Sequence, residues 1–173
     1  MIVRLSAGLA ALCLLSAPLL AQGAKPTDPQ IAHIAYTAGQ IDIEAAKLAL
    51  EKSKNKEVRD FAQDMVRDHT EVNKQALALV KKLNVTPEDN DTSRALTKQA
   101  AAKRQELSKL NGAAYDKAYV ANEVAYHKTV NGALESTLIP SANNAELKGL
   151  LQTGLKIFQG HQQHAEHVAA DVK

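Results

Sequence analysis

The chain of 173 residues has no tryptophan and only one cysteine, Cys13. Cys13 lies in an N-terminal apolar run that we expect to be removed, so the mature protein would have no disulfide, thiolate ligand or cysteine nucleophile. Aromatic residues make up 3% of the sequence, whereas alanine is abundant. This composition favours helices that approach closely over a large pocket for an aromatic ligand.

Motifs that are typical of enzymes are also missing. The sequence has no Gly-x-Ser-x-Gly turn, no glycine-rich phosphate loop and no dinucleotide-binding fingerprint. An excess of charge is missing too, because 21 Lys and Arg stand against 19 Asp and Glu. No basic cluster is denser than Lys81-Lys82 or Lys103-Arg104. We therefore expect no nucleic-acid partner, and we leave enzymatic activity open without favouring it.

The first residues have the layout of a secretory signal peptide. Arg4 precedes an apolar run over residues 5–20, and small residues follow at Ala21, Gly23 and Ala24. The run is shorter than the ~20 residues that a membrane span needs. We expect residues 1–23 to be a signal peptide, and the mature protein to lie in the periplasm without an integral membrane span. Outer-membrane association and secretion are the alternatives.

Apolar residues recur in steps of three and four along most of the remaining chain, which predicts amphipathic helices. The most regular stripe lies within residues 56–83. Asp28 and Pro29 favour a helix start, whereas Pro87 and Pro140 favour helix ends. We predict an all-α domain over residues 27–171, with helices over residues 28–53, 56–83, 92–110, 113–138 and 145–171.

The helix predicted over residues 92–110 differs from the others. It is rich in alanine and lysine and has a weaker apolar pattern, so we interpret it as a connector on the surface. At ~1.5 Å per residue it is long enough to cross most of the bundle. The expected fold is a ferritin-like four-helix bundle, in which two antiparallel hairpins are joined by a long crossover that contains this extra helix.

Histidines occupy the apolar stripes of three predicted core helices, at His69, His127 and His161. A single buried histidine is more often a hydrogen-bonded core residue than a ligand, but three on three helices favour a metal site. With ~1.5 Å of rise per residue, all three fall near the middle of the bundle, together with Glu44 and Glu123. Facing helices of this fold class commonly place metal ligands at that level.

Asp68 and His164 are further candidates for the same site. Asp68 directly precedes His69, and a carboxylate beside an imidazole can orient it for ligation. His164 follows His161 by three residues, so both could bind one ion. The alternative for His164 is a solvated polar face near a helix C-terminus, where the helix dipole favours histidine.

The residue types also limit which metal the site would hold. The Glu-x-x-His repeats of di-iron carboxylate bundles are missing, so a mixed set of His and Glu suits zinc, copper or a single iron better. Glu44 lies at the edge of its apolar stripe, and an ion pair with Lys47 or Lys74 is the alternative for it.

Four segments of the sequence resemble a known family. They are residues 39–50 (GQIDIEAAKLAL), residues 58–69 (VRDFAQDMVRDH), the segment YDKAY at residues 115–119, and QGH at residues 159–161. Together they are similar to an exported bacterial family, domain-of-unknown-function family 4142, whose members are often labelled outer-membrane proteins.

The resemblance implies a ferritin-like fold and a location in the cell envelope, but it implies no activity. Four residues match polar positions that are characteristic of the family, namely Asp68, His69, His127 and His161. The third core helix departs from the family pattern, because Tyr126 stands where an acidic residue usually precedes the histidine.

Three hypotheses on function follow from these residues. The leading one is an exported, soluble bundle that binds a transition-metal ion (zinc, copper or iron) in its core and acts in metal handling or stress protection. The second is a cell-envelope interaction module without metal, and the third is a ferritin-like oxidoreductase that acts on oxygen or peroxide. The sequence leaves a homo-oligomer open.

Overall fold

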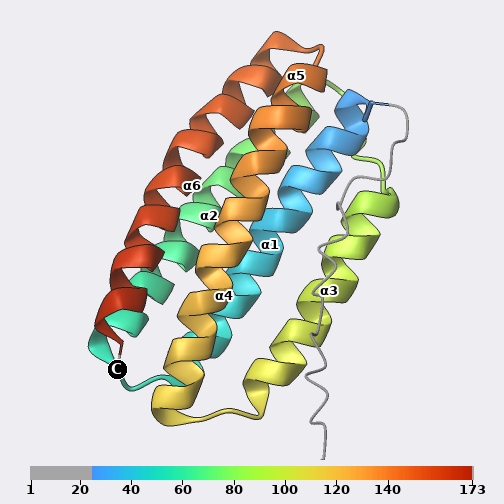
Figure 1. Cartoon of the computed structure of the whole chain (residues 1–173). Helices are drawn as coiled ribbons and strands as arrows, with labels where there is room; N and C mark the ends of the chain where they lie inside the picture. The colour runs from blue at the N-terminus through green and yellow to red at the C-terminus, as the bar shows by residue number, and fades with distance from the viewer. Residues whose placement is uncertain (1–24, 173) are drawn as a thin grey trace, which may run out of the picture.

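The computed structural model describes residues 25–172 (Figure 1). They form helices α1 Asp28–Lys52, α2 Lys56–Lys82, α3 Asp91–Ser108, α4 Gly112–Ala133, the π-helical segment η1 Leu134–Leu138, α5 Ile139–Ser141 and α6 Ala145–Asp171. The all-α prediction is confirmed. None of these helices is both long and apolar enough to cross a membrane. The signal peptide expected over residues 1–23 lies outside the described residues.

Asparagine side chains fix where three of the helices begin. Asn55 before α2 and Asn144 before α6 each accept hydrogen bonds from the backbone N–H groups two and three residues later. Asn90 accepts one from the backbone N–H at position 93, in the first turn of α3. Such a cap satisfies N–H groups that the helix itself leaves free. The helix starts predicted at residues 56 and 145 therefore agree with the structure.

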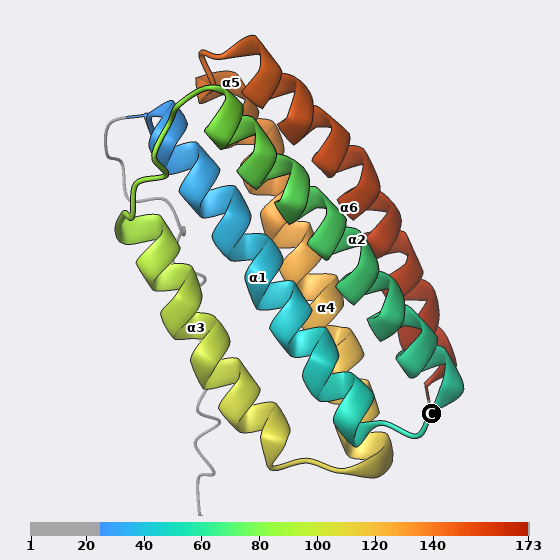
Figure 2. The ribbon, with the colours of Figure 1, turned by 180° about the vertical axis from the view of Figure 1, so that it is seen from behind.

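The helices form the crossover bundle that the sequence predicts. α1 and α2 make one antiparallel hairpin, and α4 and α6 make the other (Figure 1). α3 lies outside these four helices, alongside α1, and carries the chain from one end of the bundle to the other (Figure 2). The ferritin-like arrangement, with two hairpins joined by a crossover that contains an extra helix, is confirmed.

The helix predicted over residues 113–138 is longer and less regular than expected. α4 continues into the π-helical segment Leu134–Leu138, in which the N–H of Ile139 bonds to the carbonyl of Leu134. The chain then stays helical to Ser141, because Pro140 lies in the first turn of α5, where a missing N–H costs nothing. A π segment adds one residue per turn and widens the helix locally.

The apolar core has two halves, separated by a band of buried polar side chains. The lower half ends at the α1–α2 loop and includes Ala45, Ala46, Ala49, Val58, Phe61, Ala62, Met65, Tyr115, Tyr119, Val120, Ala165 and Val168. The upper half ends at α5 and includes Ile31, Ile34, Ile41, Leu134, Leu138, Leu147, Leu151 and Phe158. The band between them contains Asp42, His69, Glu123, His127 and His161.

Close contact between α1 and α2 makes Gly39 sensitive to substitution. A Cβ atom at Gly39 would lie 2.4 Å from Oδ1 of Asn73. The buried Asn73 amide donates to the carbonyl of Tyr36 and to the side chain of Gln40. We expect Gly39→Ala to lower the free energy of unfolding by about 1–2 kcal/mol in a denaturant titration, because this amide must move.

Gly160 is the matched control for Gly39→Ala. It also lies inside a helix, but a Cβ there would meet nothing within 4 Å. Gly160→Ala should leave stability unchanged or raise it by up to about 1 kcal/mol, since alanine is the better helix former. If Gly39→Ala matched Gly160→Ala, the close contact between α1 and α2 would be refuted.

Candidate metal centre

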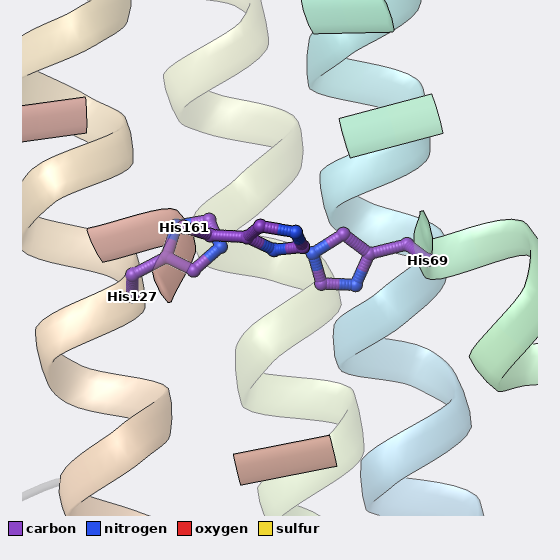
Figure 3. Close-up of side chains that lie close together, drawn as sticks. All are labelled: His69, His127 and His161. Carbon is purple, nitrogen blue, oxygen red and sulfur yellow. The ribbon is translucent and has the colours of Figure 1, made fainter. Parts of the chain in front are cut away.

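Three imidazole rings from three helices meet in the middle of the bundle (Figure 3). His69 comes from α2, His127 from α4 and His161 from α6, and each is at most 6% exposed. Their ring centroids lie 5.2–5.8 Å apart. One nitrogen of each ring lies within 4.8 Å of the others. Three nitrogens that bind one ion at about 2 Å lie roughly 3.3 Å from one another, so metal binding would draw the three rings closer together.

Hydrogen bonds fix the orientation of two of these rings. The Nδ1 of His127 lies 3.0 Å from the backbone carbonyl oxygen of Glu123. Because a carbonyl only accepts, Nδ1 carries the hydrogen and Nε2 keeps its lone pair. The Nε2 of His161 lies 3.0 Å from Oδ2 of Asp68, so its Nδ1 is the free nitrogen. This arrangement, with one N–H held by an oxygen and one bare nitrogen, is usual for metal-binding histidines.

His69 is held differently. Its ring stacks on Phe158, with the centroids 4.6 Å apart and the planes 13° from parallel. Neither ring nitrogen has a hydrogen-bond partner. Nε2 lies 3.0 Å from Oδ2 of Asp42, but the contact does not have the angle of a hydrogen bond. A neutral imidazole has one nitrogen with a free lone pair, so this buried ring can offer one nitrogen to a ligand.

Asp42 is the residue of this centre that the sequence analysis missed. Its Oδ2 lies 3.0 Å from Nε2 of His69 and 3.4 Å from Nε2 of His127. The side chain is 2% exposed, and Oδ1 has no hydrogen-bond partner. The sequence signal that could have found it is the α1 stripe Ala38, Asp42, Ala45 and Ala49, which has the same steps of four and three as the apolar stripes.

Glu123 lies beside Asp42, and the two carboxyl groups have opposite tendencies. Burial and the neighbouring Asp42 raise the pKa of Glu123 well above its usual range. Burial also tends to raise the pKa of Asp42, but His69 and His127 outweigh it and lower that pKa below its usual range. Asp42, Glu123 and His127 also offer ligand atoms within 4.8 Å of one another. Of the two carboxyl groups, Asp42 is thus the one whose charged form the surroundings favour.

Glu44 does not join the centre, which corrects its assignment as a ligand. It is exposed, and its Oε2 lies 2.6 Å from Nη1 of Arg104. Two residues along a helix correspond to a rotation of about 200°, so Glu44 faces α3 while Asp42 faces the core. Glu44 does form an ion pair, which was the alternative expected for it, but its partner is Arg104 rather than Lys47 or Lys74.

The two further candidates also have other positions than expected. Asp68 bonds to His161 on α6 rather than to the adjacent His69. His164 has 41% of its side chain exposed, and its Nδ1 lies 3.9 Å from Asp64. Its ring contacts the edge of Phe61 in the lower core instead of the other histidines. The structure therefore brings together His69, His127, His161 and Glu123, with Asp68 behind His161.

Because the histidines are buried, we expect the stability of the metal-free protein to decrease as the pH falls. Burial lowers the pKa of His161 from 6.5 to about 4, and burial also lowers that of His127. Between pH 6.5 and 4 the unfolded chain binds more protons than the folded one, so the stability present above pH 6.5 is lost as the pH falls. The shift at His161 corresponds to a loss of up to about 3 kcal/mol.

Urea unfolding with a chelator at pH 7 and pH 4.5 measures this loss. His161→Gln should reduce the difference between the two pH values, because it removes one of the titrating groups. His167→Gln on the same helix is the control, since 77% of the His167 side chain is exposed. Equal stability of the unsubstituted protein at both pH values would contradict the burial of neutral imidazoles.

Comparisons with known proteins bear on the fold and the family. The family described as Domain of unknown function (DUF4142) matches residues 15–168. No curated protein matches the sequence. The solved structures that share the fold include the following two. One carries the name of a secreted DUF305 protein of Streptomyces coelicolor, with a TM-score of 0.70, 12% identity, and coverage of 82% of this chain and 91% of that one. The other is CopM in its Cu(II)-bound form, with a TM-score of 0.64, 15% identity, and coverage of 86% and 100%.

Proposed function

This chain belongs to the DUF4142 family, and we propose that it is an exported protein that binds one transition-metal ion in its core and serves in metal handling or stress protection. The expected signal peptide over residues 1–23 supports a role in the periplasm. The proposed ligands are His69, His127 and His161, with the Asp42 carboxylate as the fourth.

The main support for this proposal is the number of buried polar atoms at this centre that lack a hydrogen-bond partner. Eleven buried side-chain nitrogen and oxygen atoms of the described residues have no hydrogen-bond partner, and seven of them belong to Asp42, His69, Glu123, His127 and His161. Buried polar groups without partners are rare in folded proteins, because each costs free energy. A bound cation would give several of these atoms a partner at once.

The donor set supports a divalent transition metal. Three neutral imidazoles and one carboxylate suit zinc and copper, and a site of this kind binds Cu(II) more tightly than the other divalent first-row metals. CopM, which has the same fold, is a Cu(II)-bound protein by name. At 15% identity this likeness supports the fold alone, and it makes copper the first metal to test. Burial of every proposed ligand supports retention of the ion over rapid exchange.

Metal retention tests this proposal directly. The mature protein is incubated with Cu(II) or Zn(II), dialysed extensively and measured by elemental analysis. We expect about one equivalent of metal to remain bound. We expect His69→Ala and His127→Ala each to abolish retention, because the ligands lie on rigid helices and no neighbouring side chain can take the place of a lost imidazole.

His167→Ala is the matched control, since His167 has 77% of its side chain exposed and its Nε2 lies 3.4 Å from Oδ2 of Asp171 on the same helix. It should retain as much metal as the unsubstituted protein. Retention that survives both core substitutions would contradict the site. Absence of any retained metal would favour the alternative of an envelope interaction module.

A further inference from the structure

The upper half of the bundle contains a cavity of about 230 Å³ that the metal proposal does not use. Residues from α1, α2, α3, α4, η1 and α6 line it. We call it the apolar chamber and define it by its buried residues Ala38, Gly154 and Phe158 and by its more exposed residues Thr92, Thr129 and Ser136. For comparison, a cavity of about 150 Å³ that was engineered into another protein is smaller and still binds benzene. A molecule larger than benzene therefore fits the chamber.

Small side chains and a wide helical turn create this space. Ala32, Ala35 and Ala38 of α1 line it, and Ala76, Ala133 and Gly154 face it from α2, α4 and α6. The π-helical segment Leu134–Leu138 forms part of the wall. π segments within helices are frequently associated with functional sites. The chamber is thus a product of this sequence and not of one missing side chain.

The walls of the chamber offer little to a polar ligand. Among residues 25–172, no charged residue lines it, and the polar lining residues are Asn73, Thr92, Thr129 and Ser136. The hydroxyls of Thr129 and Ser136 donate to carbonyls of their own helix one turn back. The amide of Asn73 donates to Tyr36 and Gln40. An ionic or strongly polar molecule would lose its hydration without compensation, whereas an apolar one would not.

The polarity of the chamber changes from its opening to its depth. Thr129 and Ser136 are the most exposed of its lining residues, and both bear a hydroxyl group. Ala38, Gly154 and Phe158 are buried. A molecule that matches this gradient has a hydrocarbon chain at one end and a small uncharged polar group at the other.

We propose that the apolar chamber binds the hydrocarbon chain of a neutral single-chain amphiphile, such as a fatty alcohol or a monoacylglycerol, with its uncharged head at Thr129 and Ser136. The inner end of the chain contacts Phe158, the residue that stacks on His69. The proposal does not depend on the metal, because none of the proposed ligands lines the chamber.

Binding of 1-octanol to the metal-free mature protein tests this inference. Octanol at a hundredfold excess over its Kd should raise Tm by roughly 5 °C or more. In NMR spectra it should shift the signals of Val72, Leu151 and Phe158, which line the chamber, and leave those of Phe61 in the lower core unchanged. Octanoate has the same chain with a charged head and should bind more weakly.

Two variants that fill the chamber make the test specific. Ala76→Leu on α2 and Ala133→Leu on α4 each place a larger apolar side chain in it, and each should weaken octanol binding at least tenfold. Ala78→Leu is the control, because Ala78 lies on α2 but is exposed and does not line the chamber. Because the two filling substitutions lie on different helices, one variant can still be tested if the other misfolds. Circular dichroism would show such misfolding.

Three results would overturn the proposal. Octanol could fail to bind saturably, or it could bind the filled variants as tightly as the unsubstituted protein. The third is a dimer in analytical ultracentrifugation that Ala76→Leu and Ala133→Leu both dissociate, since the chamber would then receive a second copy of this chain. Octanol binding that both filling variants reduce and Ala78→Leu preserves would support it.

Discussion

Adding an excess of Cu(II) or Zn(II) to the metal-free protein is expected to raise its Tm by about 10 °C. An ion that binds only the folded state at a thousandfold excess over its Kd stabilises it by about 4 kcal/mol. For a domain of this size, each kcal/mol shifts Tm by about 2–4 °C. Differential scanning calorimetry with and without metal measures the shift, and EDTA should reverse it.

The shift in Tm has to disappear when a ligand is removed. His127→Ala should melt at one temperature with or without metal, because the ion loses a ligand whose orientation the carbonyl of Glu123 fixes. His167→Ala should keep the full shift, since this side chain is largely exposed. An equal shift in the two variants would mean that metal binds at the surface.

Replacing the Asp42 carboxylate on α1 is expected to weaken metal binding by at least about 100-fold, because the ion then loses a charged ligand in surroundings of low dielectric constant. Asp42→Asn keeps the size of the side chain but removes its charge, next to His69 Nε2 at 3.0 Å and His127 Nε2 at 3.4 Å. Competition with a chromophoric chelator at pH 7 measures the change in Kd.

Glu44→Gln is the matched control for Asp42→Asn. It removes a carboxylate only two residues away, but this carboxylate is exposed and pairs with Arg104. Its Kd for the metal should stay within about twofold of the unsubstituted value, because exposed ion pairs contribute little and lie outside the centre. The reverse order, with Glu44 important and Asp42 not, would refute the assignment of Asp42 as a ligand.

The sequence alone predicts the helices well, because local signals specify them. The prediction of residues 145–171 coincides with α6, and residues 56–83 differ from α2 by one residue. Regular apolar steps and an asparagine cap mark both helices. The end of the helix predicted over residues 113–138 is wrong, since Pro140 starts a new helical turn here instead of ending the helix.

The candidate centre is only partly predictable from the sequence. His69, His127 and His161 are identified because each interrupts an apolar stripe of a helix that packs against the others. Asp42 is missed and Glu44 is chosen because α1 packs against α2, α4 and α6 on one side and α3 on the other. On a helix that is covered on both sides, the width of the apolar stripe does not tell which acidic residue faces the core.

The apolar chamber was not predicted, because small residues have two opposite effects. The abundance of alanine favours close helix contact, and Gly39 against Asn73 shows such a contact. In the upper half of the bundle, alanines on three helices face the same space and leave it open. The distance between the helix axes decides whether small residues give a close contact or an open space. The π segment and the crossover also influence this distance.

A crystal structure of the metal-loaded protein with anomalous diffraction at the metal edge tests the central claim most directly. We expect one strong anomalous peak in the band between the two core halves, within about 2.0–2.3 Å of nitrogens from His69, His127 and His161 and of an Asp42 oxygen. A peak only at the half-buried His164 or the exposed His167, or none in protein that was loaded at equimolar metal, would contradict metal binding in the core.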